Sequence, residues 1–188
     1  LMALAIGMEL GLDNATLQEL VLSGMLHDIG QITIPIEIIN KPTKLTREEF
    51  EIVKLHPVNA GIHLLKKNFV SENTFRGILG HHEKWDGTGY PNGIAGNDIS
   101  LFARILTVAD VYDALTSYRP YRVPSNPSEA IEYIMGGSGT LFDVDIVKAF
   151  LRRISPYPVG INVKLSNGEF ATVIKDNIAQ PLRPIVKV

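Results

Sequence analysis

The strongest constraint on the fold is a carboxylate placed within an apolar helical pattern. The spacing of apolar residues over 101–115 predicts a long amphipathic helix. Asp110 lies in this helix between Ala109 and Val111. A buried carboxylate without a partner is very costly, and metal coordination is one of the few ways to offset that cost. The sequence therefore predicts that other polar groups gather around Asp110.

Apolar residues recur at helical spacing in most of the chain up to Ile154. A capping box, Thr46 with Glu49, marks one helix start, and Asn14 is the expected N-cap of another helix. Residues 31–45 contain two prolines and are expected to form an extended, isoleucine-rich and packed loop. The expected helices cover residues 1–12, 14–30, 46–67 with a break at Pro57, 71–82, 101–115, 127–135 and 143–154.

The last part of the chain has a different pattern. Two alternating runs between Val163 and Ile174 are joined by Asn167-Gly168, which is a strong hairpin signal. Residues 184–188 are expected to add a third strand. The predicted fold class is therefore mainly α. We expect a helical domain over residues 1–155 and a small C-terminal appendage, a β-hairpin or three-stranded sheet, over residues 156–188.

Composition limits the kinds of ligand that the chain can hold. The formal charge of −2 excludes a global basic field for a nucleic-acid polymer or an anionic membrane. Cysteine is absent, which excludes disulfides and thiolate metal sites and fits a cytoplasmic location. No apolar run approaches the roughly 18 residues of a membrane span, so no membrane contact is expected. Any phosphate-bearing ligand must be held by a local cluster.

Two adjacent histidines, His81 and His82, precede a glycine-rich loop that holds the chain's single tryptophan. Neighbouring side chains on a helix point about 100° apart, so the two rings are expected to face different directions and to bind two ions side by side. The alternative is a helix C-terminus whose histidines meet the negative end of the helix dipole. The pair alone does not decide between these interpretations.

Polar residues at helix ends and on inner helical faces form a candidate metal set. Each one, taken singly, is also explained as a hydrogen-bonded core side chain. Together they make a mixed N/O donor set that suits Fe, Mn or another first-row divalent metal. Two such ions about 3.5–4 Å apart could activate a water and neutralise a phosphoryl group. The set is His27, Asp28, His56, His81, His82 and Asp110.

Asp113 lies one helical turn after Asp110. It is expected to orient a metal ligand or the attacking water, or to pair with a nearby arginine.

Several motifs, in order, resemble those of the HD-GYP family of cyclic dinucleotide phosphodiesterases. The run His27-Asp28-Ile29-Gly30 is similar to the HD signature, and Gly89-Tyr90-Pro91 to the GYP signature that follows a double histidine. Residues 40–46, 108–117 and 119–122 also resemble segments of the family. The resemblance spans about residues 1–154 and implies a mostly helical HD-type bundle.

The resemblance implies hydrolysis of cyclic di-GMP to a linear dinucleotide or to GMP in a bacterial cytoplasm. It also implies two or three ions, Fe, Mn or similar, on the six residues of the candidate set. Phosphate contacts are expected from Arg119 and Arg122, because guanidinium groups fork onto phosphate oxygens. Tyr90 and Pro91 would shape the loop beside the pocket. A GGDEF (diguanylate-cyclase-type) domain and an upstream sensor or receiver domain are the expected protein partners.

Two departures from the family pattern bear on catalysis, for which Asp28, Gln31 and Asp113 are the candidates. The HD signature is usually followed by lysine, and here by Gln31, which keeps a donor but lacks the charge, so slow but measurable hydrolysis is expected. The family's first ligand, a histidine, is expected ahead of Leu1. The alternative function is a catalytically weak or inactive module that binds a cyclic dinucleotide or a protein partner.

Overall fold

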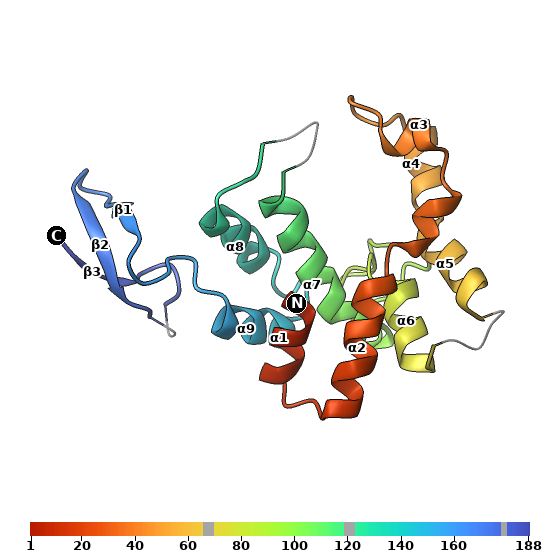
Figure 1. The fold of residues 1–188 in the computed structure, drawn as a ribbon, viewed down its shortest axis with the longest axis horizontal. Helices are drawn as coiled ribbons and strands as arrows, with labels where there is room; N and C mark the ends of the chain where they lie inside the picture. Colours follow the sequence, from red (N-terminus) through yellow and green to blue (C-terminus); the bar gives the residue numbers. More distant parts are fainter. Residues whose placement is uncertain (66–69, 119–122, 178–179) are drawn as a thin grey trace.

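The computed structural model describes residues 1–65, 70–118, 123–177 and 180–188, which form a helical bundle followed by a small sheet (Figure 1). The predicted fold class is confirmed. The helices are α1 Met2–Glu9, α2 Asn14–Leu26, α3 Ile36–Ile39, α4 Arg47–Val53, α5 His56–Leu65, α6 Glu72–Gly80, α7 Leu101–Thr116, α8 Pro127–Gly136 and α9 Val144–Arg153, with 3-10 turns η1 Ile29–Thr33 and η2 Gly96–Asp98. The strands are β1 Asn162–Lys164, β2 Phe170–Lys175 and β3 Ile185–Lys187.

Helix α7 is the centre of the bundle, and it packs against α1, α2, α6, α8 and α9. Ile105 and Val108 on this helix are fully buried. They belong to the main core, which also takes Ile6 from α1, Ile131 from α8 and Phe150 from α9. A second, smaller core joins α5 to α6. Asp110 is therefore carried by a helix that five other helices surround.

Capping side chains mark the residues at which several helices begin. The capping box of Thr46 and Glu49 at α4 is confirmed. The expected N-cap Asn14 is wrong by one residue, because Asp13 accepts a hydrogen bond from the Thr16 backbone N–H at 2.8 Å. Ser71 caps α6 in the same way. These caps satisfy backbone N–H groups that have no partner inside the helix.

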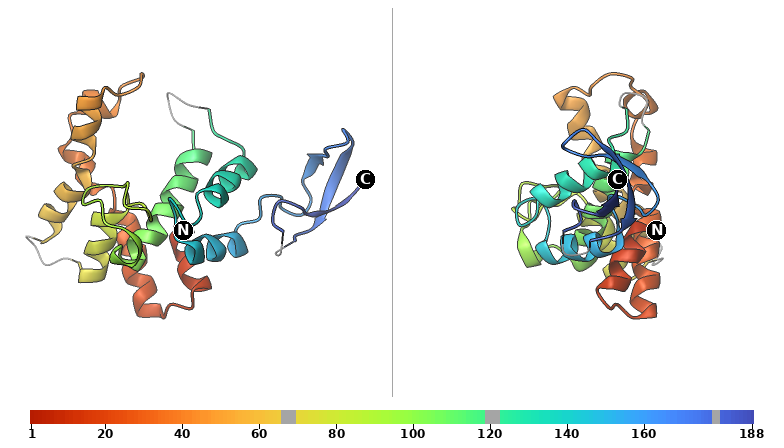
Figure 2. Two further views of the ribbon diagram at one scale, coloured as in Figure 1. Left: turned by 180° about the vertical axis from the view of Figure 1, so that it is seen from behind. Right: turned by 90° about the vertical axis from the view of Figure 1, so that its left-hand side faces the viewer.

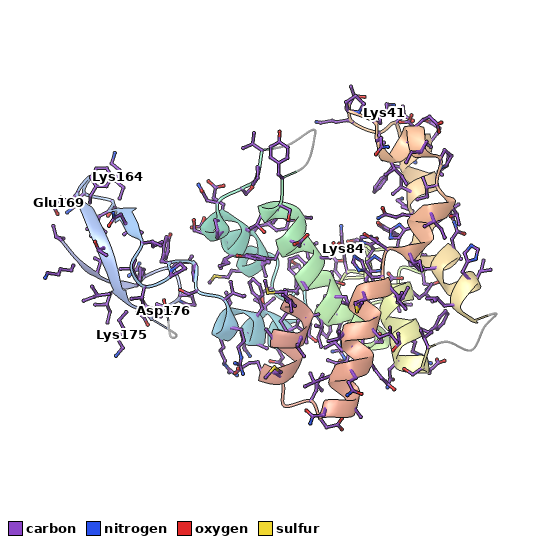
Figure 3. The ribbon with its side chains drawn as sticks, in the orientation of Figure 1. Lys41, Lys84, Lys164, Glu169, Lys175 and Asp176 are labelled. Atoms are coloured by element: carbon purple, nitrogen blue, oxygen red, sulfur yellow. The ribbon has the colours of Figure 1, made fainter. Side chains whose placement is uncertain are left out.

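Residues 31–45 depart from the expected packed loop. They contain part of η1 and the short helix α3, which with α4 forms an arm at one end of the molecule (Figure 1). Lys41 lies at the outer end of this arm (Figure 3). Ile32 is 74% exposed and Ile36 and Ile39 are also exposed. The expectation of packing holds only in part: Ile34 is 6% exposed, whereas the arm extends away from the bundle and leaves Ile32, Ile36 and Ile39 exposed.

A glycine brings η1 against α5. A Cβ atom on Gly30 would lie 1.9 Å from the carbonyl oxygen of His56 and 2.7 Å from the Ala60 nitrogen. Only glycine permits this approach of two backbones. Asp28, which immediately precedes η1, is thereby placed next to His56 at the start of α5.

The C-terminal sheet has the order β1-β2-β3 with both pairs antiparallel, as the alternating pattern predicted. Val163 lies opposite Ala171, and Val173 lies opposite Val186. Ala171 and Val173 are buried, whereas Phe170 on the other face is exposed. The sheet lies beyond α9, at the opposite end of the molecule from the arm (Figure 2). In the described part of the chain, no helix has the length and apolar character needed to cross a membrane.

Candidate metal centre

Four predicted ligands converge on one point of the bundle. One ligand atom from each of Asp28, His56, His81 and His82 lies within 4.8 Å of all the others. Asp28 follows α2, His56 begins α5, and the two adjacent histidines follow α6. Segments far apart in the sequence thus supply one compact donor set, which is the arrangement that metal coordination requires.

The carboxylate of Asp28 lies between two groups of side chains. Its Oδ1 atom is 3.2 Å from Nε2 of His56 and 3.8 Å from Nε2 of His81. Its Oδ2 atom is 3.3 Å from Nε2 of His27, and that nitrogen is 3.9 Å from Oδ1 of Asp110. The two oxygens of one carboxylate therefore face different sets of donors.

The backbone fixes the orientation of three of the imidazole rings. The Nδ1 atoms of His27, His56 and His81 each lie 2.7 Å from the carbonyl oxygen three residues earlier. A carbonyl can only accept, so each Nδ1 carries a proton and donates, and the Nε2 of each ring presents a lone pair whenever that ring is neutral. This is the tautomer that a histidine needs in order to bind a metal through Nε2.

The resulting arrangement calls for a cation. Nε2 of His56 and Nε2 of His81 are only 3.3 Å apart. Two lone pairs that face each other at this distance repel, unless a proton or a metal ion lies between or beside them. The donor set is mixed N/O, as the sequence indicated, and it fits a first-row divalent ion.

The predicted divergence of the two adjacent histidines is wrong. The rings of His81 and His82 have centroids 4.0 Å apart and an interplanar angle of 42°. The expectation assumed that both residues stand on one helix, but α6 ends at Gly80. His82 lies beyond the helix, where the backbone is free to direct both rings to the same point.

His27 and Asp110, the donors on the Oδ2 side of Asp28, border an open cleft. His27, Asp28, Asp110 and Asp113 line a cleft of about 560 Å³ between the start of α1, α2 and α7. Asp110 is partly buried, and its Oδ1 atom faces His27. Asp113 is exposed on the same side of α7. Asp113 therefore lies near the donor residues, and among the described contacts none joins it to them.

The pKa values separate the histidines into one whose pKa is raised, His27, and two whose pKa is lowered, His81 and His82. Burial opposes a charge on His27, but contacts with Asp28, with the Gly24 carbonyl and with Asp110 prevail and raise the pKa of His27 to about 9. Burial, followed by repulsion from a charge on His56, lowers the pKa of His82 to about 3. Burial likewise lowers the pKa of His81 well below its usual value. His81 and His82 are thus neutral near pH 7 and ready to bind a metal.

Asp28 is held in its charged form. Burial alone would raise the pKa of the Asp28 carboxyl, but the adjacent His27 and His56 side chains hold this pKa well below its usual range. The ionised carboxylate thus lies between His27 on one side and His56 with His81 on the other.

The glycine-rich loop covers one side of the centre. The ring of Tyr90 stacks on His82, with centroids 4.7 Å apart and an interplanar angle of 30°. The Tyr90 backbone N–H donates to the His82 carbonyl at 3.2 Å, and the Tyr90–Pro91 peptide bond is cis. A Cβ atom on Gly89 would lie 2.5 Å from that carbonyl oxygen, so the loop requires glycine there. Tyr90 therefore lies beside His82, one of the candidate ligands, and its predicted contact with a substrate stays a prediction.

Sequence reasoning missed Glu83, which holds this loop in place. Its side chain is 1% exposed and accepts the Asn92 N–H at 2.7 Å on one oxygen and the Gly93 N–H at 3.1 Å on the other. The available signal was its position directly after the histidine pair.

The remaining predicted residues line a neighbouring pocket or lie outside the residues that the structure describes. Gln31 lines a different pocket, on the side of α4, rather than the cleft beside Asp28. Arg119 and Arg122 lie outside the residues that the structure describes.

The fold and this donor set define the class of protein. The chain belongs to the HD domain family, whose model matches residues 1–146. It is 43% identical over 185 residues to the cyclic di-GMP phosphodiesterase PA4108 of Pseudomonas aeruginosa, an alignment that covers 98% of this chain and 44% of that protein. It is 42% identical over 149 residues to the cyclic di-GMP phosphodiesterase response regulator RpfG of Xanthomonas campestris, covering 77% of this chain and 38% of that protein. These relatives confirm the HD-GYP resemblance.

A solved structure shares the fold. Bd1817, an HDGYP protein of Bdellovibrio bacteriovorus, superposes with a TM-score of 0.65 at 21% identity, covering 79% of this chain and 47% of that one. The chain spans less than half the length of the relatives described above.

Proposed function

We propose that this chain is a metal-dependent phosphodiesterase that hydrolyses cyclic di-GMP to a linear dinucleotide, to GMP, or to both. The observation that carries the proposal is the set of Nε2 atoms fixed by backbone carbonyls around the ionised Asp28. The names of the similar proteins support the substrate.

We further propose that two ions would be held here, one by His56, His81 and His82 and the other by His27 and Asp110, with Asp28 available to both. Its Oδ1 atom faces His56 and His81, and its Oδ2 atom faces His27 next to Asp110. With His82 added to the first group, each group has enough donors for one ion. Neutral imidazoles with carboxylates suit Fe or Mn. When bound, such ions supply Lewis-acid polarisation of a phosphate and a nucleophilic water at neutral pH.

The chain's own residues would hold the substrate and its reacting phosphate in place. Tyr90, fixed against His82, would limit water on one side of the centre. Asp113, exposed in the cleft, is suited to orient an attacking water. Gln31 would donate a neutral hydrogen bond, weaker than the contact of a lysine. Arg119 and Arg122 would bind phosphate oxygens.

The test is turnover of cyclic di-GMP by the chain loaded anaerobically with Fe(II) or Mn(II), with products separated by chromatography. His81→Ala and Asp110→Ala are expected to lose at least one ion each and to abolish turnover. Arg76→Met, on the exposed surface of α6, is the matched control. Cyclic di-GMP that binds to the fully loaded chain without being cleaved would instead identify a binding module.

We also propose that residues 1–155 form the catalytic domain and residues 156–188 a separate appendage. The proposal is supported by the position of the sheet beyond α9 (Figure 2) and by the absence of candidate ligands after Asp113. The partner domains expected from the sequence, a GGDEF domain and an upstream sensor or receiver domain, are proposals of the same kind.

A further inference from the structure

A pocket on the arm is left unexplained by the metal centre. It has a volume of about 540 Å³ and lies against α3 and α4. Val53 and Gln31 line its inner side. The carbonyl of Val53 holds Nδ1 of His56, and Gln31 follows Asp28 by three residues. The pocket therefore adjoins the metal centre.

A series of aromatic rings connects the pocket to the centre. Phe50 lines the pocket and is 44% exposed. Its ring packs edge to face against Tyr90, with centroids 6.3 Å apart and an interplanar angle of 81°. Tyr90 in turn stacks on His82. Nζ of Lys54 lies 5.0 Å from the Phe50 centroid and 5.9 Å from that of Tyr90, which places a positive charge over both rings. An exposed aromatic ring next to a phosphate-cleaving centre is a platform for a base.

The polar part of the pocket consists of hydrogen-bond donors and neutral groups. Lys41, Lys44 and Arg47 line it, and none of the described residues that line it is acidic. Lys41 is held by Glu49 at 2.6 Å. Within the described ranges, no carboxylate lies in ion-pair distance of Lys44 or Arg47, so these two cations are available to a ligand. The pocket therefore favours a ring that presents acceptors.

We propose that this pocket is the subsite for one guanine base of a cyclic dinucleotide, with the base stacked on Phe50 and its O6 and N7 atoms accepting from Arg47. Guanine presents two acceptors on this edge, whereas adenine presents an acceptor and an N6–H₂ donor. The guanidinium of Arg47 and the ammonium of Lys44 only donate, so these two cations favour the guanine edge with its two acceptors. The inference rests on the proposed function and adds to it the residues that set base specificity.

The test compares two variants with matched controls. Kinetics are measured for cyclic di-GMP, for cyclic di-AMP and for bis(4-nitrophenyl) phosphate, which has no base, at equal metal content. Phe50→Leu should raise KM for cyclic di-GMP about 5- to 150-fold, the equivalent of about 1–3 kcal/mol of base stacking. Arg47→Met should reduce the preference for cyclic di-GMP over cyclic di-AMP by a similar factor. Neither variant should change cleavage of bis(4-nitrophenyl) phosphate. Ile52→Ala on α4 and Arg76→Met on α6, both outside the pocket, should behave like the parent.

The outcomes separate this inference from the proposed function. If the parent cleaves cyclic di-GMP and both pocket variants keep its KM and its base preference, the guanine subsite is wrong and the proposed function stands. If the parent cleaves bis(4-nitrophenyl) phosphate but neither cleaves nor binds cyclic di-GMP in calorimetry, both proposals fail.

Discussion

Replacing Glu83 with glutamine tests how strongly one buried carboxylate holds the loop over the metal centre. In the parent, both oxygens accept backbone N–H groups, those of Asn92 and Gly93, and the side chain is 1% exposed. Glutamine keeps one acceptor and turns an amide NH₂ toward the other N–H. One charge-assisted hydrogen bond is lost, worth about 1.5–3 kcal/mol, and a buried donor is left without an acceptor, at about 1–3 kcal/mol.

The expected loss of unfolding free energy for Glu83→Gln is therefore about 2.5–6 kcal/mol. In a domain of this size each kcal/mol shifts Tm by about 2–4 °C, so Tm should fall by roughly 10 °C. Thermal unfolding followed by circular dichroism measures this shift. Asp86→Asn is the matched control, because Asp86 also accepts a backbone N–H, that of Thr88, in the same loop but at an exposed position. A Tm for Glu83→Gln equal to that of the control would refute the reasoning.

Three further predictions concern charge, domain limits and catalysis. The pKa of His27 is raised from its ordinary value of 6.5 to about 9, so the charged ring stabilises the metal-free chain fully below pH 6.5, and this stabilisation is lost as pH rises through about 9. The Tm of the metal-free chain should therefore fall between these two pH values. A Tm that rises over the same range would contradict the prediction. A chain ending near Ser155 should keep its metal and its turnover, and a folded truncation that has lost its metal in elemental analysis would contradict the domain limits. Gln31→Lys should raise kcat about tenfold, which corresponds to an activation free energy lower by about 1.4 kcal/mol. KM should change little, because a charged donor acts most strongly in the transition state. Unchanged or abolished turnover at equal metal content would show that Gln31 has another role.

Local signals in the sequence predicted the helices and the sheet well. The capping box at Thr46 and the Asn-Gly turn at 167–168 depend on neighbouring residues only, and both occur as expected. The prediction that the isoleucines of residues 31–45 are packed held only in part, because burial is a property of the whole fold. An isoleucine such as Ile32 looks like a core residue in the sequence, and only the direction of the arm shows that it is exposed.

The donor set was predicted in identity but not in geometry. Residue types alone indicated His27, Asp28, His56 and Asp110, and the structure brings them together with the histidine pair. The direction of the rings depended on the residue at which α6 ends, which sequence patterns place only to within a residue or two. The role of Glu83 depended on a contact made across the folded loop.

The hydrogen bonds that three histidines make to carbonyls three residues earlier have a consequence for how the centre is filled. These contacts are made within each histidine's own segment, so the rings keep their orientation whether or not an ion is present. Little rotamer entropy remains to be lost when an ion arrives, which favours tight capture. We therefore expect that the centre can be emptied and reloaded without refolding of the chain. The identity of the ion in a living cell would consequently be decided by supply and exchange, rather than by the moment at which the chain folds.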